Sequence, residues 1–438
     1  MSGPAASIAR LGGMASLAAR GALRIGQTGA VVAGTGLDWL RGDRPETPRV
    51  LRRTFERLGA TYVKLGQFIA SSPSLFPEAY VEEFQHCLDR TRPLPWSQIR
   101  RALRQELGGR LETGFAWVDP EPLASASIAQ VHAGRLVTGE DVVLKVRKPG
   151  VQRVIVTDLN LLHLVARIAE KVTPGAAHAS LAAVVEEIQA SMLEECDFLR
   201  EAANIEAFRS YLHETGNTAA VAPWVSHELT TSRVLVMERL WGVPLTDPAA
   251  LAACTDDPEA LLVSALDTWF GSLMNCRTFH ADLHAGNLLA LRDGRVGFID
   301  FGIVGTIRES TWKALFALAD GLPRGDFGVV AAALADMGAT REGVDVPRLA
   351  ADLRDLFERL ELTPAPVPGP EIAPPGDDDL NRALMDLVAV GRRHGIRFPR
   401  EFTLLVKQFL YFDRYIRMLA PDLSLFADPR LASLPRAG

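Results

Sequence analysis

Cysteine is scarce in this sequence, and the few cysteines stand far apart. The chain of 438 residues holds Cys87, Cys196, Cys254 and Cys276, and no two of them form a CxxC pair. A disulfide framework or a structural zinc site needs clustered cysteines. We therefore expect reduced thiols in a reducing compartment.

Also missing is an apolar run long enough to cross a bilayer, which takes about 20 residues. The nearest stretch, Leu261 to Cys276, contains Asp267 and is typical of a buried core helix. We predict a cytoplasmic protein without a transmembrane helix, and leave attachment to a membrane surface open.

The segment from Met1 to Gly36 lacks acidic side chains altogether. It carries Arg10, Arg20 and Arg24 among alanines and loosely spaced apolar residues. Three interpretations are open: a segment lying on a membrane surface, an organellar transit peptide, or a mobile arm. We give the mobile arm as much weight as the other two interpretations together. No compact apolar core follows the arginines, so secretion is not expected.

A strong charge of either sign is absent as well. The net charge is -6, with 48% hydrophobic and 23% charged residues, which is the composition of a soluble globular protein. We therefore predict no nucleic-acid partner. The length suits two lobes that share a cleft.

The apolar pattern divides the chain into four segments. Residues 1–46 form the basic segment, 47–120 a helical extension, 121–240 a β-rich lobe and 241–438 a helical lobe. In the β-rich lobe, strands are indicated from Ile128 to Arg135 and from Asp141 to Arg147, followed by helices over 151–172 and 181–213. Beyond Gly242 we expect helices, apart from a strand pair between Leu288 and Ile299. This α+β plan predicts a bilobal, protein-kinase-like fold.

The strongest motif is His280-Ala-Asp282-Leu-His-Ala-Gly-Asn287, followed by Asp300-Phe-Gly. The Asp-x4-Asn spacing and the later DFG match the catalytic loop and metal-binding segment of protein kinases. Asn287 and Asp300 would offer hard oxygen ligands to Mg²⁺. Asp282 would orient or deprotonate an attacking hydroxyl or water. The alternative is a metal pair formed by the two histidines of the loop, which the following glycine argues against.

Upstream, Lys145 lies in an apolar stretch that resembles the strand carrying a phosphate-contacting lysine. Apolar neighbours on both sides predict a buried strand position, and a buried lysine needs a partner. The residues alone leave Glu194, Glu195 and Glu201 as candidates. The GxGxxG loop that ordinary kinases place before this strand is missing, as is an APE-like segment after the DFG. Residues 302–306 are instead expected to lead almost directly into a helix.

Several motifs in one order resemble the UbiB-like (AarF/ADCK-type) family of atypical kinases, over Phe55 to Leu425. These motifs are Val63-Lys-Leu-Gly-Gln67 (KxGQ), Ala124-Ser-Ala-Ser127, Lys145-Val-Arg-Lys-Pro-Gly150, Glu195-Cys-Asp197 (ExD), Arg200-Glu-Ala-Ala-Asn204, Val236 to Pro244, Phe279 to Asn287, and Asp300 to Gly305. The resemblance implies a kinase-like fold with an N-terminal helical extension covering the cleft.

The resemblance also implies roles for individual residues. Lys145 would contact nucleotide phosphates and pair with Glu201, with Asp282 as the catalytic aspartate and Asn287 and Asp300 on Mg²⁺. The alanine-rich loop of Ala124, Ser125, Ala126 and Ser127 would close on the phosphates of ATP or ADP. Backbone groups around Met237, Glu238 and Leu240 would hold the adenine. Lys64 and Gln67 would cover the cleft, where Lys64 would meet Glu195 and Asp197 at an irregular turn, because an i,i+2 pair does not share a helix face.

Two departures from the family pattern stand out: Leu283 and Ala285 replace common prolines, and no transmembrane helices end the chain. The implied function is an ATPase or a kinase of a small, lipid-like substrate, linked to isoprenoid quinone or membrane-lipid metabolism. A pseudokinase-like, nucleotide-gated scaffold is the alternative, and a conventional protein kinase is disfavoured. The partners implied are quinone-like or anionic lipids, a membrane surface and biosynthetic proteins. The phosphoryl acceptor, the quinone and the oligomeric state stay open.

Overall fold

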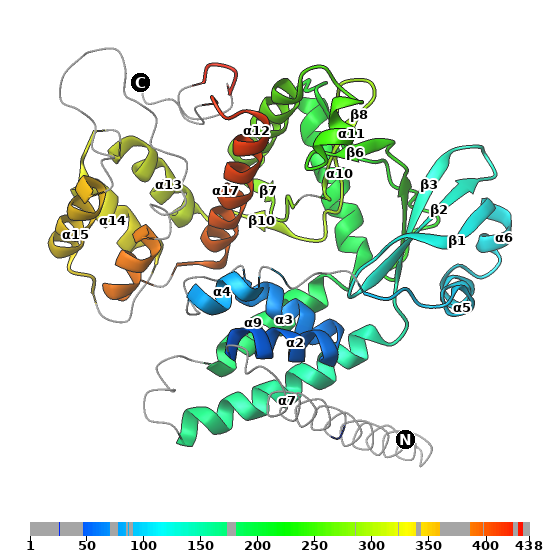
Figure 1. Cartoon of the computed structure of the whole chain (residues 1–438), viewed down its shortest axis with the longest axis horizontal. Coiled ribbons are helices and arrows are strands. Elements are labelled where there is room, and N and C mark those ends of the chain that lie inside the picture. The colour runs from blue at the N-terminus through cyan, green and yellow to red at the C-terminus, as the bar shows by residue number, and fades with distance from the viewer. Residues whose placement is uncertain are drawn as a thin grey trace, which may run out of the picture. The chain divides into compact units, whose positions relative to one another are not determined.

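The structure is a computed structural model with mixed α and β elements (Figure 1). It describes Gly26 and residues 47–70, 78–84, 86, 91–172, 181–284, 286–322, 324–338, 343–359, 386–396, 398–423 and 428–431. The basic segment (apart from Gly26), Cys87, Ala285 and the proline-rich stretch after Thr363 lie outside these residues. The described residues form two compact units. The first runs to Phe198 and adds Thr231–Leu235, and the second holds the remainder.

The first unit contains the predicted helical extension and a twisted sheet. Its helices are α2 (Thr47–Leu58), α3 (Ala60–Ala70), α4 (Glu78–Phe84), α5 (Trp96–Leu107), α6 (Arg110–Gly114), α7 (Val151–Val172) and α9 (Leu181–Glu194). The strands are β1 (Phe115–Ser125), β2 (Ala129–Leu136), β3 (Asp141–Arg147) and the start of β5 (Val234–Glu238), in the order β1-β2-β3-β5. Helices α5 and α6 pack against this sheet (Figure 1).

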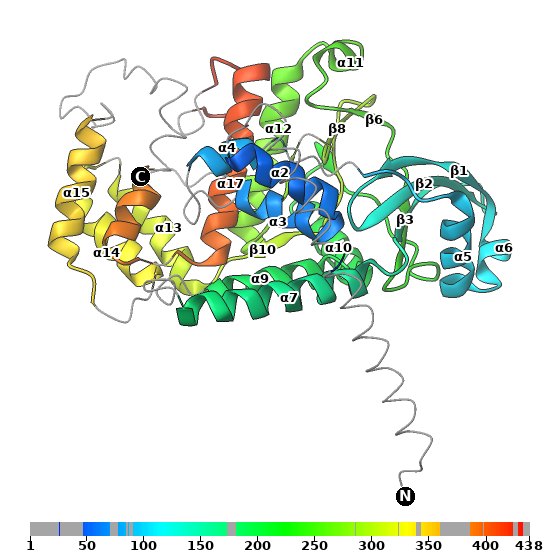
Figure 2. The ribbon, with the colours of Figure 1, turned by 60° about the horizontal axis from the view of Figure 1, so that its bottom comes forward.

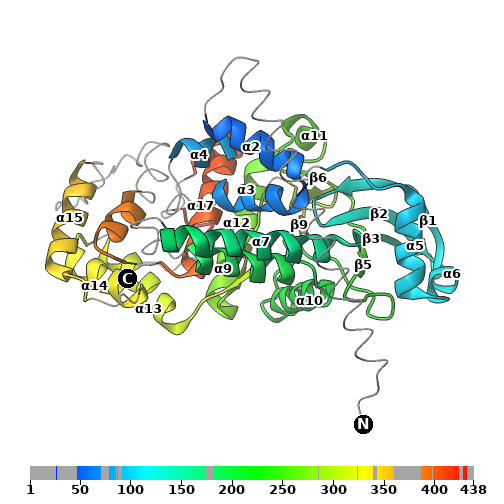
Figure 3. The same ribbon diagram turned by 90° about the horizontal axis from the view of Figure 1, so that it is seen from below.

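Apolar packing fixes α3 on the pair of long helices that follows the sheet. Ile155 and Leu159 of α7 meet Ile188 and Met192 of α9 in one buried cluster, and Leu65 of α3 packs on it. In two views α3 lies beside the α7–α9 pair, and α2 packs on α3 (Figures 2 and 3). Burying such side chains contributes about 1.5–3 kcal/mol each. The lysine of the KxGQ motif is thereby held against the end of α9.

The second unit is built around short sheets and long helices. Its helices are α10 (Phe198–Glu214, from Leu199 on), α11 (Pro248–Ala252), α12 (Pro258–Cys276), α13 (Glu309–Gly321), α14 (Phe327–Met337), α15 (Val346–Arg359) and α17 (Arg400–Leu419). Its strands are β4 (Ala220–Val221), β6 (Gly242–Pro244), β7 (Thr278–His280), β8 (Leu288–Leu291), β9 (Val296–Phe298) and β10 (Val304–Thr306). They form the sheets β4-β9-β8-β6 and β10-β7, and α17 packs beside α12 (Figure 1).

The stretch from Leu261 to Cys276 is the buried core helix that its composition predicts. It forms most of α12, and Leu262, Leu266 and Trp269 in it are fully buried. Among the described residues, the structure has no helix that is both long enough and apolar enough to cross a membrane.

Several element predictions need correction. Strand β1 begins at Phe115, before Pro120, and its pairing with β2 is interrupted by register shifts. The stretch over 181–213 is two helices, because the chain turns at Glu195 and Cys196 between α9 and α10. Beyond Gly242 the short strands β6, β7 and β10 were not expected, and residues 304–306 pair with β7 before α13 begins. The two strands predicted over Ile128–Arg135 and Asp141–Arg147 are confirmed as β2 and β3, which pair as a hairpin with its turn at Gly139.

Candidate active site

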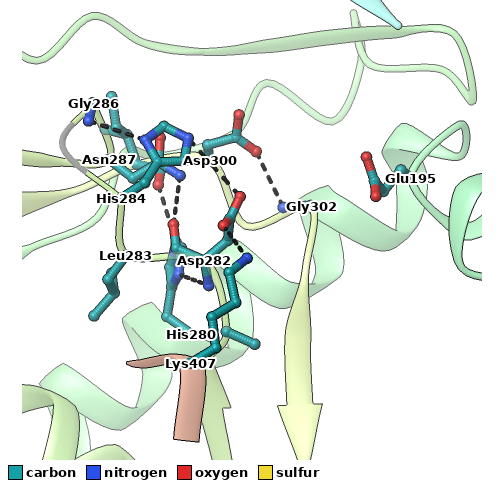
Figure 4. A network of polar contacts seen from close by, with 12 residues as sticks. Glu195, His280, Asp282, Leu283, His284, Gly286, Asn287, Asp300, Gly302 and Lys407 are labelled. Carbon is teal, nitrogen blue, oxygen red and sulfur yellow. Dashed lines mark hydrogen bonds and ion pairs between the residues drawn. The ribbon is translucent and has the colours of Figure 1, made fainter. Parts of the chain in front are cut away.

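The loop between β7 and β8 folds back on itself around Asp282. The backbone N–H of Asp282 donates to Nδ1 of His280 at 3.2 Å, and its carbonyl accepts from Nδ2 of Asn287 at 2.8 Å (Figure 4). Asn287 is buried, and its own carbonyl accepts from the N–H of Ile299 at 3.0 Å. These bonds hold the two ends of the Asp-x4-Asn motif in one turn and tie that turn to the residue before Asp300.

His280 is a structural anchor of this loop. Its Nδ1 accepts a hydrogen bond, so Nε2 carries the proton and donates to the carbonyl of Ile299 at 3.1 Å. Burial lowers the pKa of His280, which favours this neutral form. In His284, Nδ1 accepts from the N–H of Gly286 at 3.1 Å. Both ring nitrogens of His280 are thus engaged within the protein, and this geometry does not support the histidine metal pair.

Asp300 adopts a backbone conformation that residues other than glycine rarely adopt. Its φ is 59°, in the left-handed region, and its Oδ1 accepts from the N–H of Gly302 at 3.3 Å. Phe301 is fully buried against the rings of Phe208 and His280, and its carbonyl accepts from Nδ2 of Asn204 at 3.0 Å. The packed phenylalanine and this bond hold the strained turn, and such strain often accompanies function.

Glu201 lies in the same neighbourhood. It sits in the first turn of α10 with only 3% of its surface exposed. A methyl group placed on Gly302 would lie 3.2 Å from Oδ1 of Asp300 and 3.9 Å from Oε2 of Glu201. Glu201 therefore stands beside the DFG turn. Lys145 belongs to the other unit, so the predicted pairing of these two residues stays a prediction.

Helix α17 contributes residues that the sequence did not reveal. Nζ of Lys407 lies 2.9 Å from Oδ1 of Asp282 (Figure 4). The fully buried Gln408 accepts from the N–H of Leu283 at 2.9 Å and donates to the carbonyl of Ala281 at 2.8 Å. The hydroxyl of Tyr415 donates to the carbonyl of Leu283 at 2.7 Å. Only Gln408 and Tyr415, at helical spacing among apolar residues, offered a faint signal of a polar anchor.

In the first unit Lys145 is half-buried rather than buried. On β3 the side chains of Leu144 and Val146 fill the fully buried face, and Lys145 alternates to the other face. Its Nζ lies 5.6 Å from the centroid of the Phe198 ring. The strand is therefore as predicted, but Lys145 keeps access to solvent.

The alanine-rich loop is fixed by Thr91 and Lys148. The N–H of Thr91 donates to the carbonyl of Ser125 at 3.1 Å, and its hydroxyl donates to the carbonyl of Ala126 at 2.7 Å. Nζ of the buried Lys148 donates to the same hydroxyl at 2.6 Å. Ala124 is exposed and Ser127 is buried. The Ser125 hydroxyl is buried, and none of the residues that the structure describes gives it a hydrogen bond.

The structure brings Lys64 and Glu195 together within the first unit. Nζ of Lys64 lies 2.8 Å from Oε2 of Glu195, and their side chains are only 16% and 15% exposed. Glu195 and Asp197 stand at the turn between α9 and α10, as the i,i+2 spacing predicts. Gln67 lies three residues beyond Lys64 on α3, half-buried. Whether these residues cover a cleft stays a prediction.

The segment predicted to hold adenine lies at the end of β5. Met237 is buried and bridges to Val225, and the N–H of Glu238 donates to the carbonyl of Trp224 at 2.9 Å. That N–H is therefore engaged within the protein. The side chain of Leu240 lies over Gly297 of β9, where an added methyl group would meet it at 3.2 Å.

The sequence matches two family models over most of this architecture. One, described as the ABC1 atypical kinase-like domain, matches residues 86–333, and the other, the UbiB helical domain, matches residues 376–424. The chain belongs to the ABC1 atypical kinase-like family. This ABC1 chain thus carries the Asp282, Asn287 and Asp300 set inside the first match, and Lys407 inside the second.

Relatives agree with this placement. An aarF domain-containing protein kinase of Arabidopsis thaliana, described as chloroplastic, is 45% identical over 444 residues, which cover 94% of this chain and 82% of that protein. A Mycobacterium tuberculosis protein is 36% identical over 387 residues, covering 87% and 76%. The probable protein kinase UbiB of Azotobacter vinelandii is 33% identical over 394 residues, covering 89% and 71%.

Proposed function

We propose that this ABC1 chain is an ATP-dependent enzyme, either an ATPase or a kinase of a small, lipid-like substrate. The observation that carries the proposal is the turn in which Asp282, Asn287 and Asp300 are fixed by their own backbone bonds. A carboxamide oxygen and a carboxylate oxygen are ligands that Mg²⁺ accepts in phosphate-binding sites. Transfer of a phosphoryl group needs positioning and charge neutralisation more than covalent help, and this set can supply both.

The residues would divide the work as follows. Asn287 and Asp300 would hold Mg²⁺, which when bound neutralises charge on the phosphate oxygens. Asp282 would accept the proton of the attacking hydroxyl or water at a carboxylate oxygen. Lys145 would contact the phosphates from β3, and Leu240 would support the adenine. Glu201 would pair with Lys145.

We further propose a bilobal arrangement in which α2, α3 and α4 cover the cleft and exclude protein substrates. The ion pair of Lys64 and Glu195 supports a fixed position for α3. Moving α3 away would break a largely buried pair and leave one charge without its partner, which costs free energy. The probable protein kinase UbiB among the relatives supports a link to isoprenoid quinone metabolism. Anionic lipid surfaces and biosynthetic protein partners are part of the same proposal.

Nucleotide turnover by the purified protein tests the function directly. We expect Mg²⁺-dependent phosphate release from ATP, altered by vesicles of anionic lipid that contain a quinone-like lipid. The same assay with Asp282→Asn gives the background. Binding of Mg²⁺ and ATP without turnover under any of these conditions would favour the nucleotide-gated scaffold instead.

Replacing Lys64 by alanine is expected to raise self-phosphorylation or to change turnover. The substitution removes the cation that Glu195 holds and so loosens α3 at this point. Asp197→Asn should act in the same direction. Incorporation of labelled phosphate and ATP hydrolysis are measured together, with Arg53→Ala, an exposed cation of α2, as the control. Variants that match the parent in both assays would refute the covering role.

Replacing Ala126 by glycine is expected to change the ratio of ATP to ADP affinity. The N–H of Ala126 donates to the carbonyl of Ala129 at 2.9 Å in a tight turn, and a glycine there relaxes the backbone. Titrations with both nucleotides measure the ratio, and Ala124→Gly, at the exposed end of β1, is the comparison. Identical titrations for Ala126→Gly and the parent would contradict the proposed contact of this loop with phosphates.

A further inference from the structure

The loop that carries Asp282 has no cation of its own. From His280 to Asn287 the sequence contains neither lysine nor arginine. Between Asn287 and Gly302 the lysines and arginines are Arg292 and Arg295 alone. Arg295 pairs with Asp293 at 2.7 Å, at the turn between β8 and β9. The acidic groups Asp282 and Asp300 therefore need positive charge from elsewhere, above all when nucleotide phosphates are present.

Lys407 supplies that charge from a helix 125 residues further along the chain. Its Nζ lies 2.9 Å from Oδ1 of Asp282, and the two side chains are 18% and 21% exposed. At this depth the attraction is screened less than at the surface. The same ammonium lies 5.5 Å from the ring centroid of Tyr411, one helical turn on, which restricts the lysine to this direction.

The contact of Lys407 with Asp282 is not needed to hold the loop in place. Gln408 and Tyr415, on the same helix, already hold the backbone of the loop at Ala281 and Leu283. Lys407 instead contacts the carboxylate group itself. The other carboxylate oxygen, Oδ2, lies 3.9 Å from Nε2 of His284, longer than a hydrogen bond.

We propose that Lys407 is the positioning residue of the catalytic aspartate: it holds the Asp282 carboxylate in the orientation from which an oxygen can accept a proton. This inference rests on the proposed function. Because the match to the ABC1 domain ends at residue 333, the proposal makes the UbiB helical region part of the catalytic site and not an appendage to it.

The test compares Lys407→Met, which removes the charge but keeps an unbranched chain, with Lys407→Arg, which keeps the charge. For Lys407→Met we expect kcat for ATP to fall on the order of 10- to 100-fold, part of what a general base contributes. The Kd for ATP with Mg²⁺ should stay within about 2-fold, since no nucleotide contact is assigned to Lys407. Lys407→Arg should recover most of the rate. Arg417→Met, which breaks the 2.7 Å pair with Asp413 on the same helix, is the matched control.

A double variant separates positioning from structure. In an Asp282→Asn background, Lys407→Met should cost little more, because both changes remove the same function. The inference fails if Lys407→Met keeps the parent rate, or if its loss of rate adds fully to that of Asp282→Asn. It also fails if Lys407→Met and Lys407→Arg both unfold, or if both lose nucleotide affinity by the same factor as they lose rate. A parent protein that neither binds ATP with Mg²⁺ nor releases phosphate overturns the proposed function itself, and this inference with it.

Discussion

Replacing Asp300 by asparagine should remove most of the Mg²⁺-dependent affinity for nucleotide. The change takes a charged ligand from a hard cation while keeping the shape of the side chain. Asparagine tolerates the left-handed conformation that φ of 59° requires, so the strained turn should survive. Loss of an outer-sphere partner alone typically weakens metal affinity about 10- to 100-fold, and loss of a direct ligand should exceed that.

Thermal unfolding with ATP and Mg²⁺, compared with ATP and a chelator, measures this effect. In the parent, Mg²⁺ should add to the stabilisation by ATP, whereas in Asp300→Asn the two curves should coincide. Asp293→Asn, at the exposed turn between β8 and β9, removes a nearby acid without touching the site and serves as the control. An unchanged Mg²⁺ effect in Asp300→Asn would show that the metal site has been misassigned.

Replacing Gln408 by leucine should be among the most destabilising single changes in the second unit. The fully buried amide satisfies the N–H of Leu283 and the carbonyl of Ala281 at once. Leucine matches the volume but leaves both backbone groups without their partner. Each unsatisfied buried group costs about 1–3 kcal/mol, so the two together should lower the free energy of unfolding by roughly 2–6 kcal/mol.

Urea denaturation of the full chain, followed by fluorescence, tests this expectation. Turnover should fall with it, because the loop that Gln408 holds carries Asp282. Gln152→Leu, at an exposed position of α7, puts the same side chain where no buried partner is lost, and should unfold like the parent. Equal stability of Gln408→Leu and the parent would mean that water replaces the lost bonds.

The sequence predicts those parts of the site whose signal is local. The Asp-x4-Asn spacing and the DFG lie within 23 residues of His280, and the structure ties them together through short-range bonds. The turn at Glu195 and Asp197 follows from helix geometry, because residues two apart cannot share one face. The hairpin of β2 and β3 follows from alternation and a glycine with positive φ.

Features that depend on distant partners left no such signal. Lys407 lies on an amphipathic helix, where a lysine is normally solvated, and nothing nearby in the sequence connects it with Asp282. Strand β1 contains Pro120 and Pro122, which argue against a strand, and only its pairing with β2 reveals it. Lys145 was expected to be buried because both neighbours are apolar, but strand alternation turns it to the other face.

The large separation in sequence between α17 and the loop around Asp282 has a consequence for how the protein folds during its synthesis. A ribosome adds about 5–20 residues per second, so several seconds pass between synthesis of Asp282 and of Gln408. During that interval the backbone groups of Ala281 and Leu283 lack the bonds that Gln408 and Tyr415 give them in the folded protein. Contacts of such separation form late, since their ends must first be brought together. A nascent chain arrested before Lys407 would therefore present the nucleotide-binding motifs without α17 on the loop, and we expect activity only once α17 has been synthesised.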